Sequence, residues 1–151
     1  MSGNWELEKV SKLFDDTVAI DDISLEIEKN KIYGLIGRNG AGKTTLLKLL
    51  ANQLQPCSGI IRKGNENLKD NDRLIQGICL ARETININGI KKFSAKKIFK
   101  FASDIYPNWD NEYCEELIKQ FDLNINRKYI KLSKGMHTVI GIIIGLVSRA
   151  P

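Results

Sequence analysis

Residues 37–44 combine the residue types and the spacing that a phosphate-binding loop requires. The stretch Gly37-Arg38-Asn39-Gly40-Ala41-Gly42-Lys43-Thr44 fits the pattern G-x-x-x-x-G-K-[ST] at every fixed position. Glycines let the backbone turn tightly, so that successive N–H groups face one point. In this pattern Lys43 reaches the β- and γ-phosphates of a nucleotide, and the hydroxyl of Thr44 ligates Mg²⁺. The bland alternative is a glycine-rich turn without a ligand, and the motif alone also fits kinases, GTPases and nucleic-acid motors.

The elements on either side of this loop are those that its chemistry needs. Residues 31–36 form an almost continuous apolar run, which predicts a strand covered on both faces. Residues 43–54 follow a helical period, and Pro56 and Gly59 end the helix. Its expected apolar face consists of Leu46, Leu47, Leu50 and Leu54. A helix that begins directly after the loop adds unpaired amides and a partial positive charge, which favour a polyphosphate.

The rest of the chain predicts an α/β protein. Alternating apolar residues before residue 28 indicate half-buried antiparallel strands, and two short strands are expected at 59–63 and 76–80. A lysine-rich helix is expected from an N-cap at Ser94 to Tyr106, followed by an acidic helix that begins near Asp110. The buried stripe predicted for this acidic helix consists of Tyr113, Cys114, Leu117, Ile118 and Phe121. A markedly apolar helix closes the chain at Arg149.

Composition excludes several classes of protein. The 151 residues carry a net charge of +5, with 42% hydrophobic and 27% charged residues, as in ordinary globular domains. A membrane span needs about 20 apolar residues, and the longest apolar run, 139–147, is far shorter. His137 is the only histidine, which excludes a His-based zinc site and a Ser-His-Asp triad. The three cysteines are widely spaced and are expected to be reduced, buried residues. We therefore expect a soluble protein with no secretory signal.

Two separated motifs resemble those of the ATP-binding subunits of ABC transporters. The segment from Gly34 to Leu46, GLIGRNGAGKTTL, is similar to the P-loop of that family, and residues 18–25 resemble the strand before it. Residues 132–136, LSKGM, resemble the family signature usually written LSGGQ. Residues 106–110 and 148–151 are similar to a Gram-positive branch whose signature reads LSKGM. The resemblance covers nearly the whole chain.

This resemblance implies a fold and a division of the chain. The fold is the P-loop NTPase fold of the ABC type, an α/β fold with an antiparallel β subdomain, a P-loop sheet core and a small helical subdomain. The chain is then one nucleotide-binding domain over residues 1–151, truncated before the Walker B strand. Its expected parts are a β and P-loop portion at 1–82, a helical subdomain at 83–132 and the signature helix at 133–151.

The resemblance also implies which residues bind MgATP. Phe14 lies 23 residues before Gly37, where the family places an aromatic ring that stacks on adenine; the alternative is a core residue at a strand end. Glu83 occupies the usual glutamine position of the Q-loop, where it is a tentative catalytic and Mg²⁺-binding residue or else a solvated loop residue. Ser133 and Gly135 clamp the γ-phosphate held by another subunit, although Ser133 also suits a plain N-cap. The full binding set is Phe14, Gly37, Arg38, Asn39, Gly40, Ala41, Gly42, Lys43, Thr44, Thr45, Ser133, Lys134, Gly135 and Met136, with Thr44 and Glu83 at the metal.

Departures from the family pattern limit these expectations. Met136 replaces the usual glutamine of the signature, and Thr138 and Val139 stand where polar or basic residues are common. In the family, Pro151 leads into the strand that carries the Mg²⁺-binding aspartate and the catalytic glutamate. Without these residues we expect the chain to bind MgATP but to hydrolyse it poorly. We also expect bare apolar strand edges, which promote aggregation.

The expected function is that of the ATP-binding subunit of an ABC exporter. The resemblance implies a second nucleotide-binding subunit and transmembrane permease subunits as partners, and a location in the cytoplasm on the inner face of the cell membrane. The lysine-rich helix lies in the subdomain that meets the permease, but a simple solvated face explains its charge equally well. Two alternatives stay open: a soluble ABC-type ATPase acting on nucleic acid, which the positive charge favours slightly, and an ATP-binding remnant that does not hydrolyse.

Overall fold

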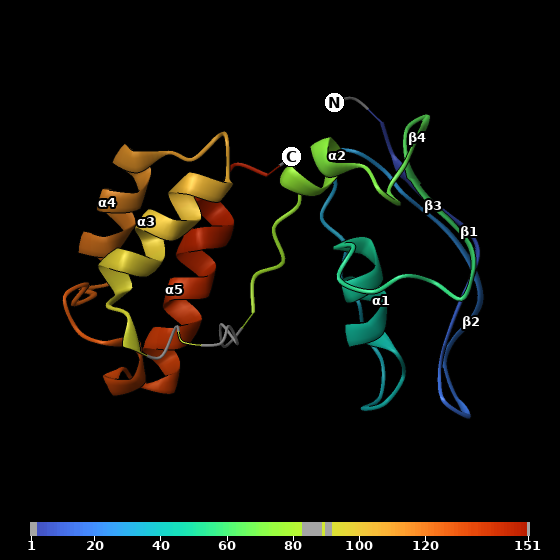
Figure 1. Cartoon of the computed structure of the whole chain (residues 1–151), viewed down its shortest axis with the longest axis horizontal. Coiled ribbons are helices and arrows are strands. Elements are labelled where there is room, and N and C mark those ends of the chain that lie inside the picture. The colour runs from blue at the N-terminus through green and yellow to red at the C-terminus, as the bar shows by residue number, and fades with distance from the viewer. Residues whose placement is uncertain (1–2, 83–88, 90–91, 151) are drawn as a thin grey trace. The chain divides into compact units, whose positions relative to one another are not determined.

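The chain folds into two compact units, residues 1–75 and 76–151, which are described separately below (Figure 1). The computed structural model describes residues 3–82, 89 and 92–150. Among these residues, no helix has both the length and the apolar character needed to cross a membrane. The division expected after residue 82 lies within the second of these two units, residues 76–151.

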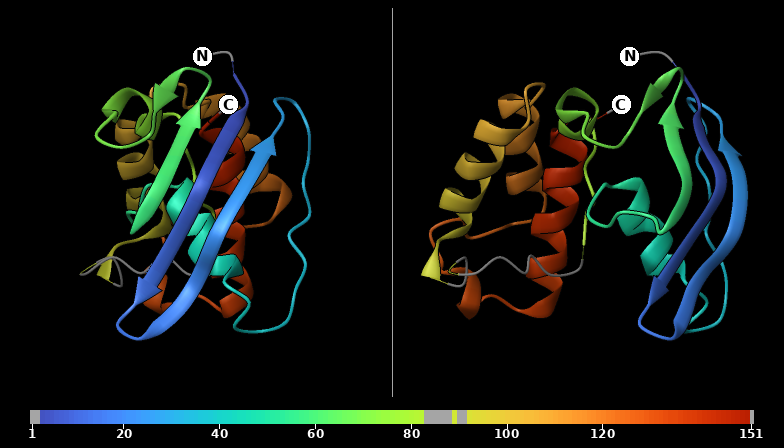
Figure 2. Two further views of the ribbon diagram at one scale, coloured as in Figure 1. Left: turned by 90° about the vertical axis from the view of Figure 1, so that its right-hand side faces the viewer. Right: turned by 45° about the vertical axis from the view of Figure 1, so that its right-hand side comes forward.

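The first unit is built on a four-stranded antiparallel sheet. Its strands are β1 (Trp5–Phe14), β2 (Thr17–Ile27), β3 (Ser58–Lys63) and β4 (Glu66–Asn67), in the order β2-β1-β3-β4 (Figure 2). A tight hairpin joins β1 to β2, because Phe14 pairs with Thr17, and the pairing extends to Trp5 and Ile27. The antiparallel strands expected before residue 28 and near residues 59–63 are confirmed.

Helix α1 (Lys43–Leu50) lies against one face of this sheet (Figure 2), and the short helix α2 (Asp72–Gln76) closes the unit. Leu46 and Leu49 are the buried side chains of α1, whereas Leu47 is exposed. The helix predicted over residues 43–54 begins at Lys43 as expected, but it ends at Leu50 and not at Leu54. Its apolar face is also rotated, because the helix packs on the sheet through positions 46 and 49.

Two strands predicted from apolar runs are wrong. Residues 31–36 carry apolar side chains but pair with no described strand, and Ile32 and Ile36 are 103% and 94% exposed. An extended segment becomes a strand only when a neighbouring strand takes up its backbone N–H and C=O groups. At 76–80 the chain leaves α2 through a turn and continues without regular structure.

The described residues of the second unit form a bundle of three longer helices. These are α3 (Ala95–Ile105), α4 (Asn111–Gln120) and α5 (Lys134–Val147), and the short 3₁₀ turn η2 (Tyr129–Lys131) lies before α5. The predicted N-caps Ser94 and Ser133 are confirmed, and Asp110, expected only near the start of its helix, is the N-cap of α4. Each of the three side chains accepts a hydrogen bond from the backbone N–H three residues on. The expected helical segment and the signature helix thus share one unit.

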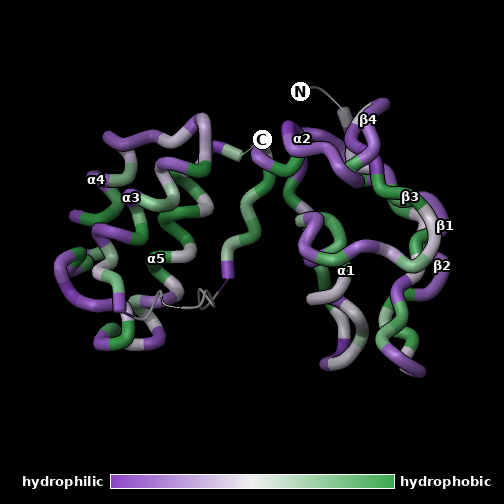
Figure 3. The backbone as a smooth tube through the Cα atoms, viewed as in Figure 1, coloured by the Kyte–Doolittle hydropathy of each residue, from purple (hydrophilic) through white to green (hydrophobic). Residues whose placement is uncertain are grey.

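The core of the second unit gathers around α5, which is apolar along most of its length (Figure 3). Cys114 and Leu117 supply the buried side of α4, with Tyr113 and Ile118 partly buried beside them. Phe121, predicted to complete this stripe, is exposed, because α4 ends at Gln120 and Phe121 is its C-cap residue. The buried cluster comprises Ala95, Ile98, Phe99, Cys114, Leu117, Leu123, Tyr129, Leu132, Ile140, Ile143 and Val147.

Candidate functional site

The loop of residues 37–42 leads into α1 through two glycines in the left-handed conformation. Gly40 has φ +84° and Gly42 has φ +79°, values that side-chain-bearing residues rarely adopt. Between them the N–H of Ala41 donates to the carbonyl of Arg38 at 3.2 Å, which closes a turn. Gly42 is the N-cap residue of α1 and brings no side chain to cap it. The positive end of α1 is therefore left for an anion rather than for a side chain.

Gly42 is also the point at which the loop rests on β2. A Cβ atom added to Gly42 would lie 2.3 Å from the carbonyl oxygen of Ala19 and 2.9 Å from the side chain of Ile20. No side chain fits in this contact, so only glycine allows α1 to begin here. The loop is therefore fixed to the sheet by a backbone contact that the motif pattern alone does not reveal.

The Lys43 ammonium group folds back over its own loop. Its Nζ donates to the carbonyl oxygens of Gly37 and Arg38, both at 2.7 Å. These contacts hold a full positive charge over the loop. An anionic oxygen would bond to the same ammonium group more strongly than a neutral carbonyl does.

The two threonines after Lys43 occupy different environments in the first turn of α1. Thr44 is exposed, so its hydroxyl is accessible to a metal ion, whereas Thr45 is half-buried. The next residue, Leu46, is buried and its N–H donates to the carbonyl of Gly42 at 2.9 Å. The helix is therefore already regular one turn after the loop.

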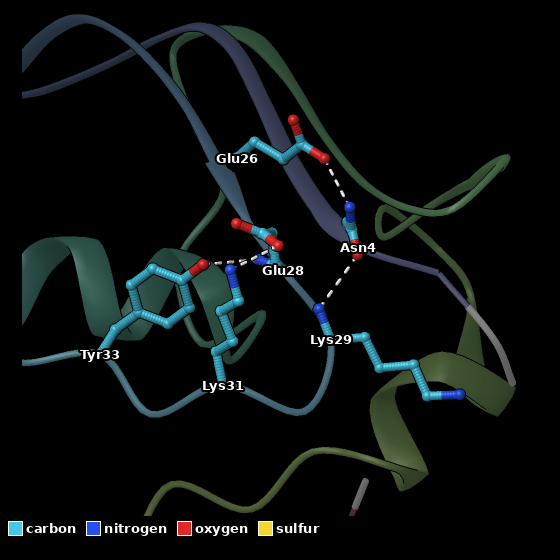
Figure 4. Close-up of polar contacts among 6 residues, drawn as sticks. All are labelled: Asn4, Glu26, Glu28, Lys29, Lys31 and Tyr33. Atoms are coloured by element: carbon cyan, nitrogen blue, oxygen red, sulfur yellow. Dashed lines mark hydrogen bonds and ion pairs between the residues drawn. The ribbon is translucent and has the colours of Figure 1, made fainter.

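A polar network fixes the chain that approaches the loop (Figure 4). The amide side chain of Asn4 donates to the carboxylate of Glu26 and accepts from the N–H of Lys29 at 3.0 Å. The Tyr33 hydroxyl accepts from the N–H of Glu28 at 2.9 Å. Asn4 thus ties the turn after β2 to the start of β1. Sequence reasoning missed Asn4, and no local signal marks a polar residue that acts across 25 positions.

Phe14 lies at the end of β1, beside the hairpin that turns into β2. Its ring is 43% exposed, and Lys12 Nζ lies 5.3 Å from the ring centroid. The views in Figures 1 and 2 place this hairpin and the beginning of α1 at the same end of the first unit. The structure thus brings Phe14 and the loop to one end of the sheet and leaves the ring open to solvent.

The signature residues form the first turn of α5 in the second unit. The Ser133 hydroxyl accepts from the N–H of Met136 at 3.3 Å, so Ser133 caps the helix. Ser133, Lys134 and Gly135 are exposed, whereas Met136 packs against the core of the unit. This turn therefore presents backbone and a hydroxyl to solvent while Met136 anchors it.

Glu83 lies outside the described residues, but the chain just before it rests on α5. A Cβ atom added to Gly141 would lie 2.4 Å from the carbonyl oxygen of Arg82, and one added to Gly145 would lie 3.2 Å from Cβ of Ala81. The two glycines are one helical turn apart, so residues 81 and 82 cross α5 where it has no side chains. Sequence reasoning interpreted this helix as apolar and as the signature helix, and did not single out its two glycines.

Comparison with known proteins gives consistent findings. The sequence profile of the family described as "ABC transporter" matches residues 20–151. The chain is 31% identical to the ABC transporter ATP-binding protein YtrB of Bacillus subtilis strain 168, over 95% of this chain and 49% of YtrB. It is 33% identical to the ATP-binding protein NatA of the same organism, over 85% of this chain and 54% of NatA. The chain thus spans about half the length of the curated relatives it matches.

Solved structures establish the fold. One, described as the ATP-binding subunit of an ABC transporter, superposes with a TM-score of 0.82 at 21% identity, over 98% of this chain and 63% of that one. A second, a nucleotide-free ATP-binding cassette from an ABC transporter, gives a TM-score of 0.70 at 19% identity, over 99% of this chain and 66% of that one. The expected fold class is therefore confirmed.

Proposed function

Because the chain belongs to the ABC transporter family, we propose that it binds MgATP as part of the ATP-binding subunit of a transporter. The loop 37–45 holds the phosphates in this proposal. The observation that carries it is the Lys43 ammonium group held by two carbonyls of its own loop, at the start of a helix without a side-chain cap. Both features favour an incoming polyphosphate.

The residues of the loop fit a Mg-nucleotide. The amides at the start of α1 and the Lys43 charge supply the positive surroundings that phosphate oxygens need. Mg²⁺ is commonly bound by one or two protein oxygens together with phosphate oxygens and water, and the exposed Thr44 hydroxyl suits such a position. The bound ion would neutralise charge on the terminal phosphates.

Adenine stacking on Phe14 completes the proposed nucleotide site in the first unit. The exposed ring lies at the same end of the sheet as the loop, which supports this role. In the proposal, Lys12 beside the ring adds positive charge at the adenine side. In the proposal, Ser133, Lys134, Gly135 and Met136 meet the γ-phosphate of a nucleotide held by a second subunit, and the exposure of Ser133, Lys134 and Gly135 supports this role.

Within this loop we place phosphate binding and charge compensation, and not the activation of water. ATP hydrolysis needs a group that orients or deprotonates the attacking water. None of residues 37–45 is a carboxylate or a histidine. On the family pattern alone, we propose that Glu83 lies near the bound metal ion. We also propose that this chain hydrolyses ATP, and so releases phosphate, slowly.

The proposed partners are a second nucleotide-binding subunit and membrane permease subunits, with the protein on the inner face of the membrane. Helix α3 supports a permease contact, because Phe101 and Ile105 are exposed one turn apart beside the exposed Lys97 and Lys100.

The Gram-positive branch with the LSKGM signature is supported by the two Bacillus subtilis relatives.

The test is equilibrium binding of a fluorescent ATP analogue to the chain and its Lys43→Ala variant. Loss of a hydrogen bond to a charged group removes about 1.5–3 kcal/mol, which is roughly a 10- to 100-fold rise in the dissociation constant. Lys48→Ala, at the other end of α1, is the matched control and should bind as the parent does. Equal affinity of the parent and the Lys43 variant would refute the proposed site.

A further inference from the structure

His137, the only histidine of the sequence, holds the signature turn to the 3₁₀ turn before it. The imidazole lies flat on the ring of Tyr129, with ring centroids 3.9 Å apart and an interplanar angle of 12°. Its Nε2 lies 2.8 Å from the backbone carbonyl oxygen of Tyr129. A carbonyl oxygen only accepts, so this contact assigns the ring hydrogen to Nε2.

Tyr129 is itself firmly anchored, so the contact ties His137 to a fixed point. Its side chain is 4% exposed within the helical core, and its N–H donates to the carbonyl of Phe93 at 2.8 Å. The Tyr129 carbonyl also accepts from the N–H of Leu132 at 3.0 Å. The Tyr129 carbonyl oxygen therefore accepts two hydrogen bonds, one from the backbone of Leu132 just before α5 and one from the imidazole of His137 in the first turn of α5.

The proposed phosphate-binding residues lie in the sequence between Tyr129 and His137. Ser133, Lys134 and Gly135 are exposed, and the Ser133 hydroxyl accepts from the N–H of Met136. The N–H of His137 donates to the carbonyl of Ser133 at 3.0 Å, which is the first helical hydrogen bond of α5. The backbone of the residue that carries the imidazole is therefore bonded directly to the backbone of the N-cap residue Ser133.

We propose that His137 is a positioning residue, which sets the Ser133 hydroxyl and the first amides of α5 for the γ-phosphate of a nucleotide held by a second copy. This inference rests on the proposed function. The ring supplies two separate constraints, a stacked face and one N–H donor, and it contacts no phosphate itself. Because each constraint acts on Tyr129, the effect on phosphate binding is indirect.

The experiment measures self-association of the chain in the presence of a slowly hydrolysed Mg-ATP analogue, by analytical ultracentrifugation. His137→Ala should weaken the nucleotide-dependent association by about tenfold, the scale of one lost hydrogen bond together with a packing contact. Binding of the fluorescent analogue by the dilute monomer should not change. Thr138→Ala is the matched control, since it removes a local bond to the Lys134 carbonyl on the same turn and does not touch Tyr129.

Two conservative variants separate the constraints. His137→Gln retains an N–H donor near the Nε2 position, and His137→Phe retains the stacked ring without the donor. We expect each to recover part of the association that alanine loses, whereas a role limited to folding would follow the melting temperatures of the variants instead. Association that tracks thermal stability alone would overturn the inference.

A spectroscopic readout tests the geometry without any nucleotide. With a single histidine, the long-range ¹H–¹⁵N spectrum contains one imidazole pattern, and we expect it to show a hydrogen on Nε2, the nitrogen that faces the Tyr129 carbonyl. The opposite tautomer would overturn the inference. Unchanged association of His137→Ala alongside lost association of Ser133→Ala would also overturn it, while leaving the proposed function intact. Absence of nucleotide-dependent association in the parent chain with Lys43-dependent binding intact would overturn the trans role of Ser133 and this inference with it.

Discussion

Helices α1 and α5 both begin at segments that we propose to bind phosphate, but their first turns are completed differently. At α1 the N-cap is Gly42, held by its backbone conformation and its contact with Ala19. At α5 the N-cap is Ser133, whose hydroxyl satisfies one amide, and Tyr129 supports the turn through His137. The same attraction of a helix start for anions is thus built on backbone geometry in one unit and on side chains in the other.

The largest effect is expected from Gly42→Ala, and Gly40→Ala is the variant with which its loss of stability is compared. Both glycines have positive φ, which costs an alanine about 1–2 kcal/mol. Only at Gly42 does the added methyl meet Ala19 and Ile20, whereas Gly40 faces open space. Overpacking adds about 1–3 kcal/mol, so Gly42→Ala should lose about 2–5 kcal/mol in urea unfolding. Equal losses in the two variants would show that the contact with β2 is unimportant.

A smaller effect is expected at α5 from Ser133→Ala, which removes the cap. Such substitutions cost about 1 kcal/mol of stability, measured as the shift of the urea midpoint. Ser133→Asp keeps a capping oxygen and should stay close to the parent in stability, yet its charge should oppose a phosphate at the same place. If Asp and Ala destabilised the chain equally, the Ser133 hydroxyl would not act as a cap.

The smallest effect concerns α4, which begins with a titratable cap. The Asp110 carboxylate accepts from the N–H of Tyr113 at 2.9 Å and from the Arg149 guanidinium at 2.8 Å. These bonds, with that to Tyr113 the larger cause, hold the pKa of Asp110 below its ordinary 3.8. Because the folded pKa is depressed, the stabilisation is present above pH 3.8 and disappears as pH falls through the folded value.

Asp110→Asn keeps a capping oxygen but loses the charge. We expect the parent to be slightly more stable than this variant at neutral pH, and the two to converge in acid, in denaturant titrations at a series of pH values. The pair with Arg149 is partly exposed, so added salt should also reduce the difference. A difference that persists unchanged in acid would exclude the Asp110 charge as its cause.

Local signals in the sequence predicted the second unit well. Ser94, Asp110 and Ser133 each precede an amphipathic or apolar run, and each caps the helix expected there. These are short-range effects, because a capping side chain acts on an amide three residues away. The loop 37–44 and the start of α1 were predictable for the same reason.

Long-range requirements explain the errors. The run 31–36 is apolar enough for a strand, but a strand also needs a partner, and a single segment carries no information about one. The buried face of α1 depends on how the helix lies on the sheet, so Leu49 was missed and Leu47 wrongly included. The stacking of His137 on Tyr129 spans eight residues through a turn, which no periodic pattern reveals.

The glycines of α5 limit how this helix can be engineered for stability. Replacing a helical glycine by alanine ordinarily gains up to about 1 kcal/mol, which makes Gly141 and Gly145 obvious targets. At Gly145 the new methyl would need Ala81 to yield by only a few tenths of an ångström, whereas at Gly141 it would collide with the backbone of Arg82. Thermostabilised variants of this protein should therefore accept alanine at position 145 and retain glycine at 141.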